Sequence, residues 1–355
     1  MQVAILFGGK SAEHEISIRS ANNVFKNLDK NIYQPVLIKI DKQGKWLTDE
    51  NLLKSKNFSS INDLKDFNPK DIINLIPGTD KPFVVNNYKF GIDVVFPVLH
   101  GPNGEDGSVQ GLLKILGLPF VGPSVLGSAA GMDKEIMKRL LLQAGIPVGK
   151  YMVAQYGKYP AFEEVKNTLG MPVFIKPANM GSSVGISRIS NENQYHNAIK
   201  TAYQYDTKLV IEANINGREI ECAILGNENP QASIPGEVTA TKEFYDYEAK
   251  YLDDKGYEIK IPAQLDDNTI QKVQEIAVKT FKVLECEGLS RVDVFLTEEN
   301  EILVNEINTL PGFTSISMYP MLWREAGIEY PELISKLLDL ALERHKRDSK
   351  LKMTI

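Results

Sequence analysis

The residues with the greatest chemical potential lie in two consecutive strand-like segments, SRVDVFL at 290–296 and ILVNEIN at 302–308. A turn centred on 299–300 would close them into a hairpin that places Asp293 opposite Glu306. Side chains two residues apart share a strand face, so the polar groups of both strands project together. Two carboxylates held opposite each other, with Cβ atoms about 4.5–5.5 Å apart, repel each other. The hairpin therefore needs a positive charge.

A divalent cation is the first candidate for that charge. Hard cations such as Mg²⁺ bind carboxylate oxygens, and Asn308 on the same face supplies a neutral third ligand. The alternative is that Arg291, which faces Asn308, simply neutralises the two acids. The flanking residues are apolar, which predicts buried strands in which unpaired charge is unfavourable. We therefore favour a metal site formed by Asp293, Glu306 and Asn308.

A second candidate site is the segment MPVFIKPANMGSSVGIS at 171–187. An apolar strand ends in Lys176, and the loop after it combines glycines with Ser182 and Ser183. Glycines let the backbone approach a phosphate, while N–H and hydroxyl groups donate to its oxygens and the lysine supplies charge. The segment lacks the G-K-[ST] ending of a Walker A loop, and an ordinary flexible connection is the alternative. Its combination with the acidic hairpin favours phosphate binding.

Lys134 follows the expected N-cap Asp133, in the first turn of a helix whose dipole disfavours a cation. A bound anion would remove that conflict, and the alternative is a solvated lysine. Further along, an apolar strand runs into a connection between two lobes, formed by Glu212, Ala213, Asn214 and Ile215. Its backbone groups could read an adenine edge, and Glu219 could accept from ribose hydroxyls. The alternative is an ordinary turn followed by a surface glutamate.

The segment KEFYDYEAKY at 242–251 mixes aromatic and charged residues without clean periodicity. It predicts a long ordered loop, and such loops often act as lids. The alternative is a surface excursion packed by its own tyrosines.

Composition narrows the class of protein. The chain has 355 residues, a formal charge of −6 and only two cysteines, Cys222 and Cys286. The modest charge predicts no general attraction to nucleic acid or to an anionic membrane, and two cysteines imply no disulfide framework. No signal peptide is evident, and no apolar run reaches the roughly 20 residues that cross a bilayer. We expect a cytoplasmic protein whose two cysteines are core residues.

The order of elements predicts three units. Strands alternating with helices over residues 1–122 predict an α/β unit with a parallel sheet. Residues 123–215 predict a small α+β unit. Residues 216–355 predict an α+β unit that carries the acidic hairpin and a lid loop at about 236–256.

The motifs together resemble the D-alanine–D-alanine ligases, an ATP-grasp family of carboxylate–amine ligases. The similar stretches span essentially the whole chain: GGKSAEHEIS at 8–17, HGPNGEDG at 100–107, MDK at 132–134, the SSVG loop, EFYDYEAKY at 243–251, SRVD at 290–293 and NEINTLPGFTSISMYP at 305–320. The resemblance implies a three-domain ATP-grasp fold with ATP clasped between the central and C-terminal domains. It also implies a homodimer.

The resemblance assigns residues to the nucleotide and its metal ions. The implied phosphate contacts are Lys134, Lys176, Ser182, Ser183 and Lys250, the adenine lies along Glu212, Ala213, Asn214 and Ile215, and Glu219 holds the ribose. Asp293, Glu306 and Asn308 would hold two Mg²⁺ or Mn²⁺. Ala213 departs from the lysine of some relatives, so only backbone contacts to adenine are expected from it.

The resemblance also implies a place for each D-alanine. Glu13 would anchor the first ammonium with His100 nearby, and Ser182 and Tyr251 would hydrogen-bond around Glu13. Arg291 and the Gly312 N–H would form an oxyanion site, while Ser317 and the backbone of Met318 would receive the second carboxylate. The implied reaction forms an acyl phosphate from ATP and then D-alanyl-D-alanine, for peptidoglycan precursors.

Other readings of the sequence remain open at this point. They are a D-Ala–D-Ser or D-Ala–D-lactate ligase, another ATP-grasp ligase, and a nucleotide-binding regulator without catalysis. A dehydrogenase is suggested only by Gly8-Gly9 after the first strand, and the G-x-G-x-x-G pattern is missing.

Overall fold

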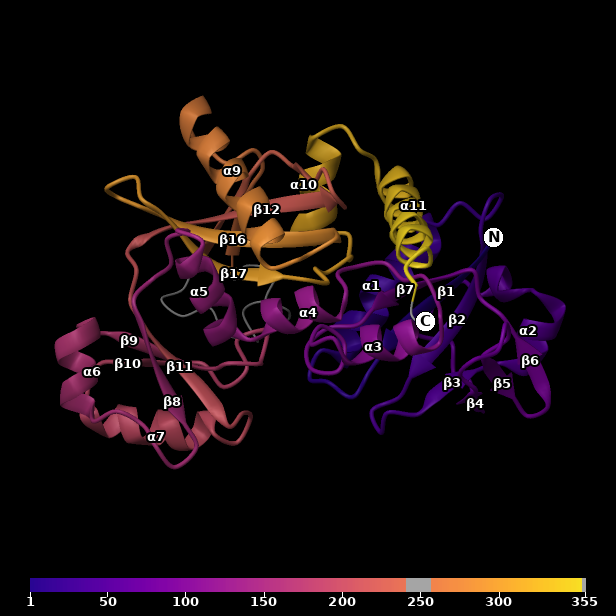
Figure 1. The fold of residues 1–355 in the computed structure, drawn as a ribbon, viewed down its shortest axis with the longest axis horizontal. Helices are drawn as coiled ribbons and strands as arrows, with labels where there is room; N and C mark the ends of the chain where they lie inside the picture. The colour runs from indigo at the N-terminus through magenta and orange to yellow at the C-terminus, as the bar shows by residue number, and fades with distance from the viewer. Residues whose placement is uncertain (241–256, 353–355) are drawn as a thin grey trace.

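The structure is a computed structural model that describes residues 1–240 and 257–352. Figure 1 shows three bodies, with the N-terminal unit on the right, the central unit at lower left and the C-terminal unit at the top. Within the described ranges, no helix combines the length and the apolar character needed to cross a bilayer.

The N-terminal unit is built on a sheet whose described strands follow the order β6-β5-β4-β3-β2-β1-β7. Its elements are β1 (Gln2–Gly8), α1 (His14–Asn27), β2 (Gln34–Ile40), β3 (Trp46–Thr48), α2 (Glu50–Ser55), the 3-10 helix η1 (Phe58–Ser60), β4 (Asp71–Leu75), β5 (Phe83–Val85), β6 (Tyr88–Phe90), β7 (Val94–Val98) and α3 (Ser108–Ile115). Strands β2, β1 and β7 pair in parallel, as predicted. The pairs from β2 to β6 are antiparallel, which the prediction of a parallel sheet missed. The short connections in β2-β3 and β4-β5-β6 leave no room for the crossover that parallel pairing requires.

The central unit is a sheet with the strand order β10-β9-β11-β8. Its elements are β8 (Tyr151–Gln155), α6 (Phe162–Leu169), β9 (Val173–Pro177), β10 (Ser187–Ile189), α7 (Glu192–Ala202) and β11 (Lys208–Ala213). The alternating apolar positions of β9 and β11 face the apolar sides of α6 and α7, and together they form a core of their own.

The C-terminal unit is a mainly antiparallel sheet in which β15, β14, β12, β16 and β17 lie side by side and β13 pairs with β12. Its elements are β12 (Gly217–Gly226), β13 (Gln231–Ala232), β14 (Gly236–Ala240), β15 (Tyr257–Lys260), α9 (Asp267–Val283), β16 (Gly288–Thr297), β17 (Ile302–Asn308), α10 (Met318–Glu325) and α11 (Tyr330–Asp348). Helix α9 packs on this sheet through Val273, Ala277 and Phe281.

Two connections tie the units together. Helices α4 (Val125–Met132) and α5 (Lys134–Gln143), placed in the central unit by the sequence, pack against the C-terminal sheet through Met137 and Leu141. Helix α11 joins the N-terminal and C-terminal units in one apolar cluster, where Arg344 donates to the Phe120 carbonyl at 2.7 Å. The central sheet, with its separate core, is therefore the most independent of the three bodies.

Candidate active site

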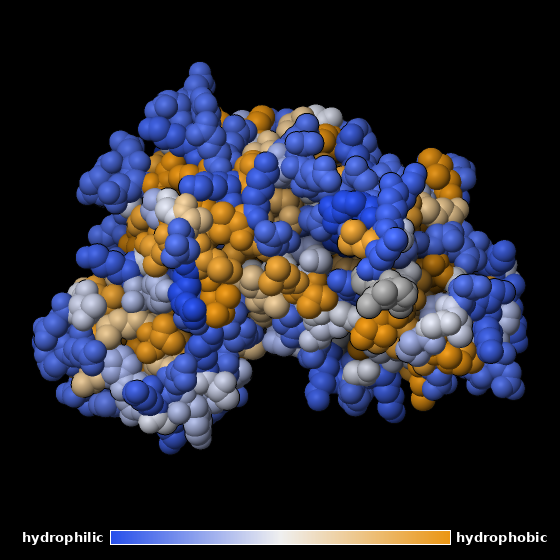
Figure 2. Space-filling model, viewed as in Figure 1, coloured by the Kyte–Doolittle hydropathy of each residue, from blue (hydrophilic) through white to orange (hydrophobic). Residues whose placement is uncertain are grey.

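A cavity of about 520 Å³ opens where the three units meet. Figure 2, in the view of Figure 1, shows a notch in the outline between the central unit, at lower left, and the N-terminal unit, at lower right. The cavity is lined by ten of the predicted site residues: Glu13, His100, Lys134, Ser182, Arg291, Glu306, Asn308, Gly312, Ser317 and Met318. Residues far apart in the sequence therefore meet in one place.

The acidic hairpin formed by β16 and β17 has the predicted register at the site. Asp293 pairs with Glu306, and Arg291 pairs with Asn308. A bulge beyond Asp293 leaves Asn305 as an extra residue of β17, so the pairing toward the turn is shifted by one residue. The predicted centre of the turn was wrong, because an uninterrupted ladder was assumed.

Arg291 is held between two buried carboxylates. Its Nε and Nη2 donate to the two carboxylate oxygens of Asp293 at 2.7 Å each, and its Nε lies 2.8 Å from Oε2 of Glu221 on β12. Burial alone would lower the pKa of Arg291, but the charges of Asp293 and Glu221 raise that pKa well above its ordinary value. The sequence analysis missed Glu221. Its signal was the alternation in REIEC at 218–222, which puts Glu219 and Glu221 on one strand face.

The groups around Asp293 fit a divalent cation in charge and atom type. Asp293 and Glu306 bring two carboxylates from neighbouring strands. The Asn308 side-chain N–H donates to Asp293 at 2.9 Å, which leaves the amide oxygen of Asn308 for a cation. The described part of the chain holds no metal-like group of three His, Cys, Asp or Glu side chains, so further ligands would be amide, water or phosphate oxygens. The ion pair between Arg291 and Asp293 also agrees with the alternative in which the arginine only neutralises acids.

Lys134 is buried, with 8% of its surface exposed, so the alternative of a solvated lysine is wrong. Its Nζ donates to the Met180 carbonyl at 2.7 Å and lies 3.6 Å from Oε2 of Glu306. Its backbone N–H donates to the Ala178 carbonyl at 3.0 Å. Helix α5 thereby connects the serine loop, residues 178–186, to the acidic hairpin and places a cation at the cavity wall.

The serine loop joins β9 to β10, which pair in the predicted antiparallel hairpin. Ser182 and Ser183 have positive φ angles of 51° and 60°, a strained conformation for residues other than glycine that is common at functional sites. The Ser182 hydroxyl donates to the carboxylate of Glu13 in the N-terminal unit. Gly101 lies against the same carboxylate, where a Cβ would come within 3.0 Å of Oε2. The structure thus brings Glu13 and Ser182 together as the sequence predicted.

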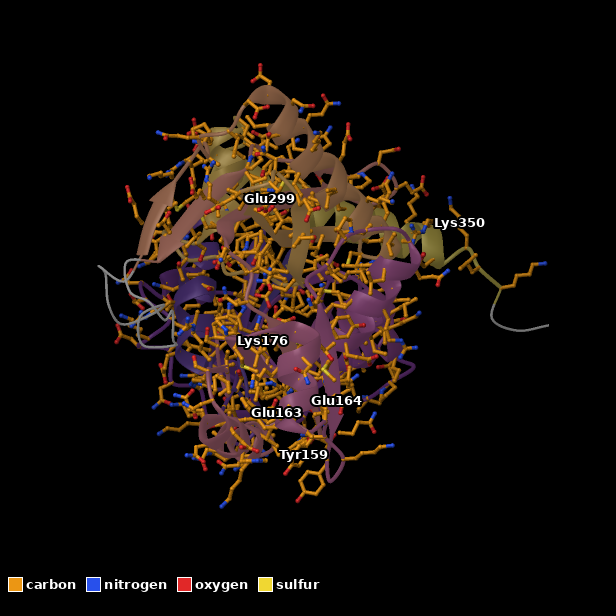
Figure 3. The ribbon with its side chains drawn as sticks, turned by 90° about the vertical axis from the view of Figure 1, so that its left-hand side faces the viewer. Tyr159, Glu163, Glu164, Lys176, Glu299 and Lys350 are labelled. Carbon is orange, nitrogen blue, oxygen red and sulfur yellow. The ribbon has the colours of Figure 1, made fainter. Side chains whose placement is uncertain are left out.

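Lys176 and Glu212 meet a third residue that the sequence analysis missed, Lys138 on α5. Lys176 Nζ lies 2.6 Å from one carboxylate oxygen of Glu212, and Lys138 Nζ lies 2.8 Å from the other. Burial alone would raise the pKa of Glu212, but the charges of Lys176 and Lys138 hold that pKa far below its ordinary value. Figure 3 shows Lys176 toward the middle of the molecule, whereas Tyr159 points outward at the tip of the central unit. The available signal for Lys138 was its position one turn after Lys134.

The connection after Glu212 uses part of its backbone internally. Ala213 and Asn214 donate their N–H groups to the carbonyls of Lys150 and Pro172, at 3.0 and 3.3 Å. An N–H that reads an adenine edge must therefore come from Ile215 or beyond. As far as the described residues define the cavity, Lys176, Ser183, Glu212, Ala213, Asn214, Ile215, Glu219 and Asp293 do not line its wall.

Two residues of the HGPNGEDG loop reach the cavity. His100 Nδ1 donates to the Leu310 carbonyl at 3.2 Å, because a carbonyl can only accept. Glu105 accepts from the N–H groups of Gly101, at 2.7 Å, and Leu310, at 3.4 Å. Burial and the nearby charge of Glu13 raise the pKa of Glu105 to about 8. The motif contained Glu105, but the sequence analysis gave it no role.

Ser317 and Met318 lie at the N-terminus of α10, where the helix begins at the cavity wall. The Ser317 hydroxyl accepts from the Thr314 N–H at 2.9 Å. A Cβ on Gly312 would come within 2.9 Å of that hydroxyl, which explains a glycine at this position. The positive end of a helix suits a carboxylate, in agreement with the role predicted for these residues.

Two further predictions concern the 242–251 segment and the two cysteines. Lys250 and Tyr251, with the rest of the 242–251 segment, lie outside the described residues. Cys222 and Cys286 are free and buried, which confirms that they are core residues. Burial raises the pKa of the Cys222 thiol to about 12, so it is not a reactive thiolate.

Comparisons with known proteins match this chain to D-alanine–D-alanine ligases over nearly its whole length. Two protein-family models match, described as D-ala D-ala ligase N-terminus, over residues 2–123, and D-ala D-ala ligase C-terminus, over residues 140–339. A D-alanine–D-alanine ligase of Oceanobacillus iheyensis is 51% identical, covering 99% of this chain and 98% of that protein. The solved D-alanine–D-alanine ligase of Coxiella burnetii is 36% identical with a TM-score of 0.87, covering 99% of this chain and 96% of that one. The VanG D-Ala:D-Ser ligase of Enterococcus faecalis is also 36% identical, with a TM-score of 0.85 and coverage of 96% and 99%.

Proposed function

This chain belongs to the D-alanine–D-alanine ligase family, and we propose that it uses ATP to join two D-alanine molecules into D-alanyl-D-alanine, a building block for peptidoglycan. One observation carries the proposal. A single cavity holds Glu13 as an anchor for an ammonium group, Arg291 as a cation for an oxyanion, and the N-terminus of α10 as a site for a carboxylate. A regulator that only binds nucleotide has no use for these three groups together.

We propose the following roles in the reaction. Glu13 anchors the ammonium group of the first D-alanine, and the Ser182 hydroxyl holds the Glu13 carboxylate in place. Lys134 and Lys176 bind the triphosphate, whose γ-phosphoryl group passes to the carboxylate of the first D-alanine to give an acyl phosphate and ADP.

The second half-reaction uses the C-terminal unit. The second D-alanine, held by its carboxylate at Ser317 and Met318, attacks the acyl carbon through its amine. Arg291 and the Gly312 N–H stabilise the tetrahedral oxyanion until phosphate leaves with the bonding electron pair. No covalent bond to the protein forms in either step.

We propose that Asp293, Glu306 and Asn308 hold Mg²⁺ or Mn²⁺, with two ions implied by the family resemblance. When bound, such ions supply the positive charge that lets an anionic carboxylate approach a triphosphate. The nucleoside is assigned to residues 212–215 and Glu219, and a closing segment to Lys250 and Tyr251. A homodimer, a cytoplasmic location and the domain limits 1–122, 123–215 and 216–355 are proposed from the sequence alone.

A D-Ala–D-Ser ligase is the second candidate, because the sequence identity to the VanG D-Ala:D-Ser ligase, 36%, equals that to the D-alanine–D-alanine ligase of Coxiella burnetii. The test is ADP release with D-alanine alone, and with D-serine or D-lactate added, with the products identified by mass spectrometry. We expect D-alanyl-D-alanine as the main product at equal acceptor concentrations. A predominance of the D-serine or D-lactate product would reject the first assignment, and absence of D-alanine-dependent ADP release would reject both.

A further inference from the structure

The buried carboxylate of Glu212 has two lysine partners from different elements. Lys176 at the end of β9 lies 2.6 Å from Oε2, and Lys138 on α5 lies 2.8 Å from Oε1. Glu212 is 7% exposed, so water does not take the place of either partner. The single negative charge of Glu212 is therefore paired with two positive charges.

The two lysines differ in their freedom to move. The Lys138 side chain is 2% exposed, and its Nζ lies 5.7 Å from the centroid of the Tyr151 ring. It extends from α5, a helix whose Met137 and Leu141 are fixed in the core of the C-terminal unit. The Lys176 side chain is 14% exposed and directly precedes the serine loop. The structure therefore leaves Lys176 more room to turn away from Glu212 than it leaves Lys138.

This difference matters because the proposed function requires Lys176 at a phosphate. If Lys176 were the sole partner of Glu212, its departure would leave a buried carboxylate without a counter-charge, which is strongly unfavourable. The second cation removes that obstacle, because Glu212 keeps a hydrogen-bonded partner on its other oxygen.

We propose that Lys138 is a positioning residue for nucleotide binding, an inference that rests on the proposed function. It keeps the Glu212 carboxylate paired and oriented, and this frees Lys176 to exchange Glu212 for a phosphate of ATP. Without Lys138, Glu212 would hold Lys176 and the triphosphate would lose a cation.

The test compares Lys138→Met with wild type by calorimetric titration of the full chain with a non-hydrolysable ATP analogue and with AMP. We expect the affinity for the triphosphate to fall about tenfold or more, and the affinity for AMP to fall much less. Lys138→Arg keeps the charge and should restore most of the triphosphate affinity. As a control, Lys166→Met removes a lysine of α6 whose partner, the exposed Glu163, lies 3.3 Å away (Figure 3), and it should change neither affinity. Equal losses for triphosphate and AMP, or an unchanged triphosphate affinity, would overturn the proposal.

A second pair of variants covers the case in which Lys138→Met does not fold. In a Glu212→Gln background there is no buried carboxylate left for Lys138 to hold, so adding Lys138→Met should not weaken triphosphate binding. A further large loss in the double variant would show that Lys138 acts independently of Glu212 and would reject the mechanism. These experiments measure nucleotide binding and not dipeptide synthesis. If the proposed function is wrong, wild-type protein would bind the ATP analogue but form no dipeptide, and that result is distinct from a failure of the role proposed for Lys138.

Discussion

Two buried charge clusters at this site have opposite compositions. In the lysine cluster one carboxylate, Glu212, lies between Lys138 and Lys176, whereas in the arginine cluster one guanidinium, Arg291, lies between Glu221 and Asp293. Among the described residues, the first cluster contains more positive than negative charges and the second contains more negative than positive charges. A buried cluster with a net charge favours a ligand of the opposite sign. This difference agrees with the phosphate proposed for the first cluster and the metal ion proposed for the second.

The clusters also differ in how the fold holds them. The arginine cluster lies on the neighbouring strands β12 and β16 of one sheet, so its geometry is fixed by a hydrogen-bonded ladder. The lysine cluster joins β9 and β11, which belong to the central core, to α5, which belongs to the C-terminal core. Its geometry therefore depends on how two bodies lie against each other. We expect changes in the arginine cluster to affect chemistry and changes in the lysine cluster to affect nucleotide binding.

The largest effect is expected from Arg291→Ala. Removing the cation that meets the oxyanion should lower the rate of dipeptide formation by at least about 10²–10³-fold. The affinity for an ATP analogue should change little, because the lysine cluster is intact. Steady-state dipeptide assays and calorimetry separate the two quantities, with Arg347→Ala as the control, since Arg347 forms an exposed ion pair with Glu287 at 2.6 Å. Dipeptide formation at the wild-type rate would remove Arg291 from the mechanism.

The second-largest effect is expected from removing a negative charge of the arginine cluster. Asp293→Asn keeps the shape of the side chain but removes one of the two carboxylates assigned to the cation. The dissociation constant of Mn²⁺ in the presence of an ATP analogue, measured by electron paramagnetic resonance, should rise about 100-fold. Unchanged Mn²⁺ binding would favour the alternative in which Arg291 only neutralises acids.

A smaller effect is expected from Glu221→Gln. The Glu221 carboxylate holds the Arg291 guanidinium at 2.8 Å and is the partner left to it when a cation occupies Asp293. Losing that charge should lower the rate of dipeptide formation about tenfold. ADP release should fall less, so more ADP would form per dipeptide, because the first step does not require Arg291. A proportional fall of both products would mean that Glu221 acts on the fold and not on Arg291.

The two clusters also differ in how well their residues could be predicted from the sequence. The register of Asp293 and Glu306 could be predicted because a hairpin is local and its side chains alternate with a period of two. Lys138, Glu105 and Glu221 were missed because their partners come from distant segments, and no local pattern states which strand or helix lies beside another. In the central unit only the hairpin of β9 and β10 is local in this sense, whereas β11 pairs with β8 and β9 across intervening elements, a pairing that no local pattern predicted.

The smallest effect is expected at Glu105, which differs from the acids of the arginine cluster. It avoids a further negative charge in the cavity by keeping its proton, whereas Asp293 is paired with a cation. Its pKa is raised from 4.5 to about 8 by burial and by the charge of Glu13. Between these values the folded protein holds a proton that the unfolded chain releases. The stabilising contribution of protonated Glu105 is therefore complete below pH 4.5 and is lost as the pH rises through about 8.

Glu105→Gln mimics the protonated acid at every pH and should remove this dependence. Relative to wild type, its thermal midpoint should rise between pH 5 and pH 8.5, by about 2–4 °C for each 1 kcal/mol of stability that the wild type loses. The measurement is differential scanning calorimetry of both proteins at the two pH values. Parallel midpoints would mean that Glu105 is ionised in the folded protein at pH 7. The Glu105 carboxylate would then add a negative charge beside Glu13 and Glu306. A cation other than Arg291 would be needed to balance it.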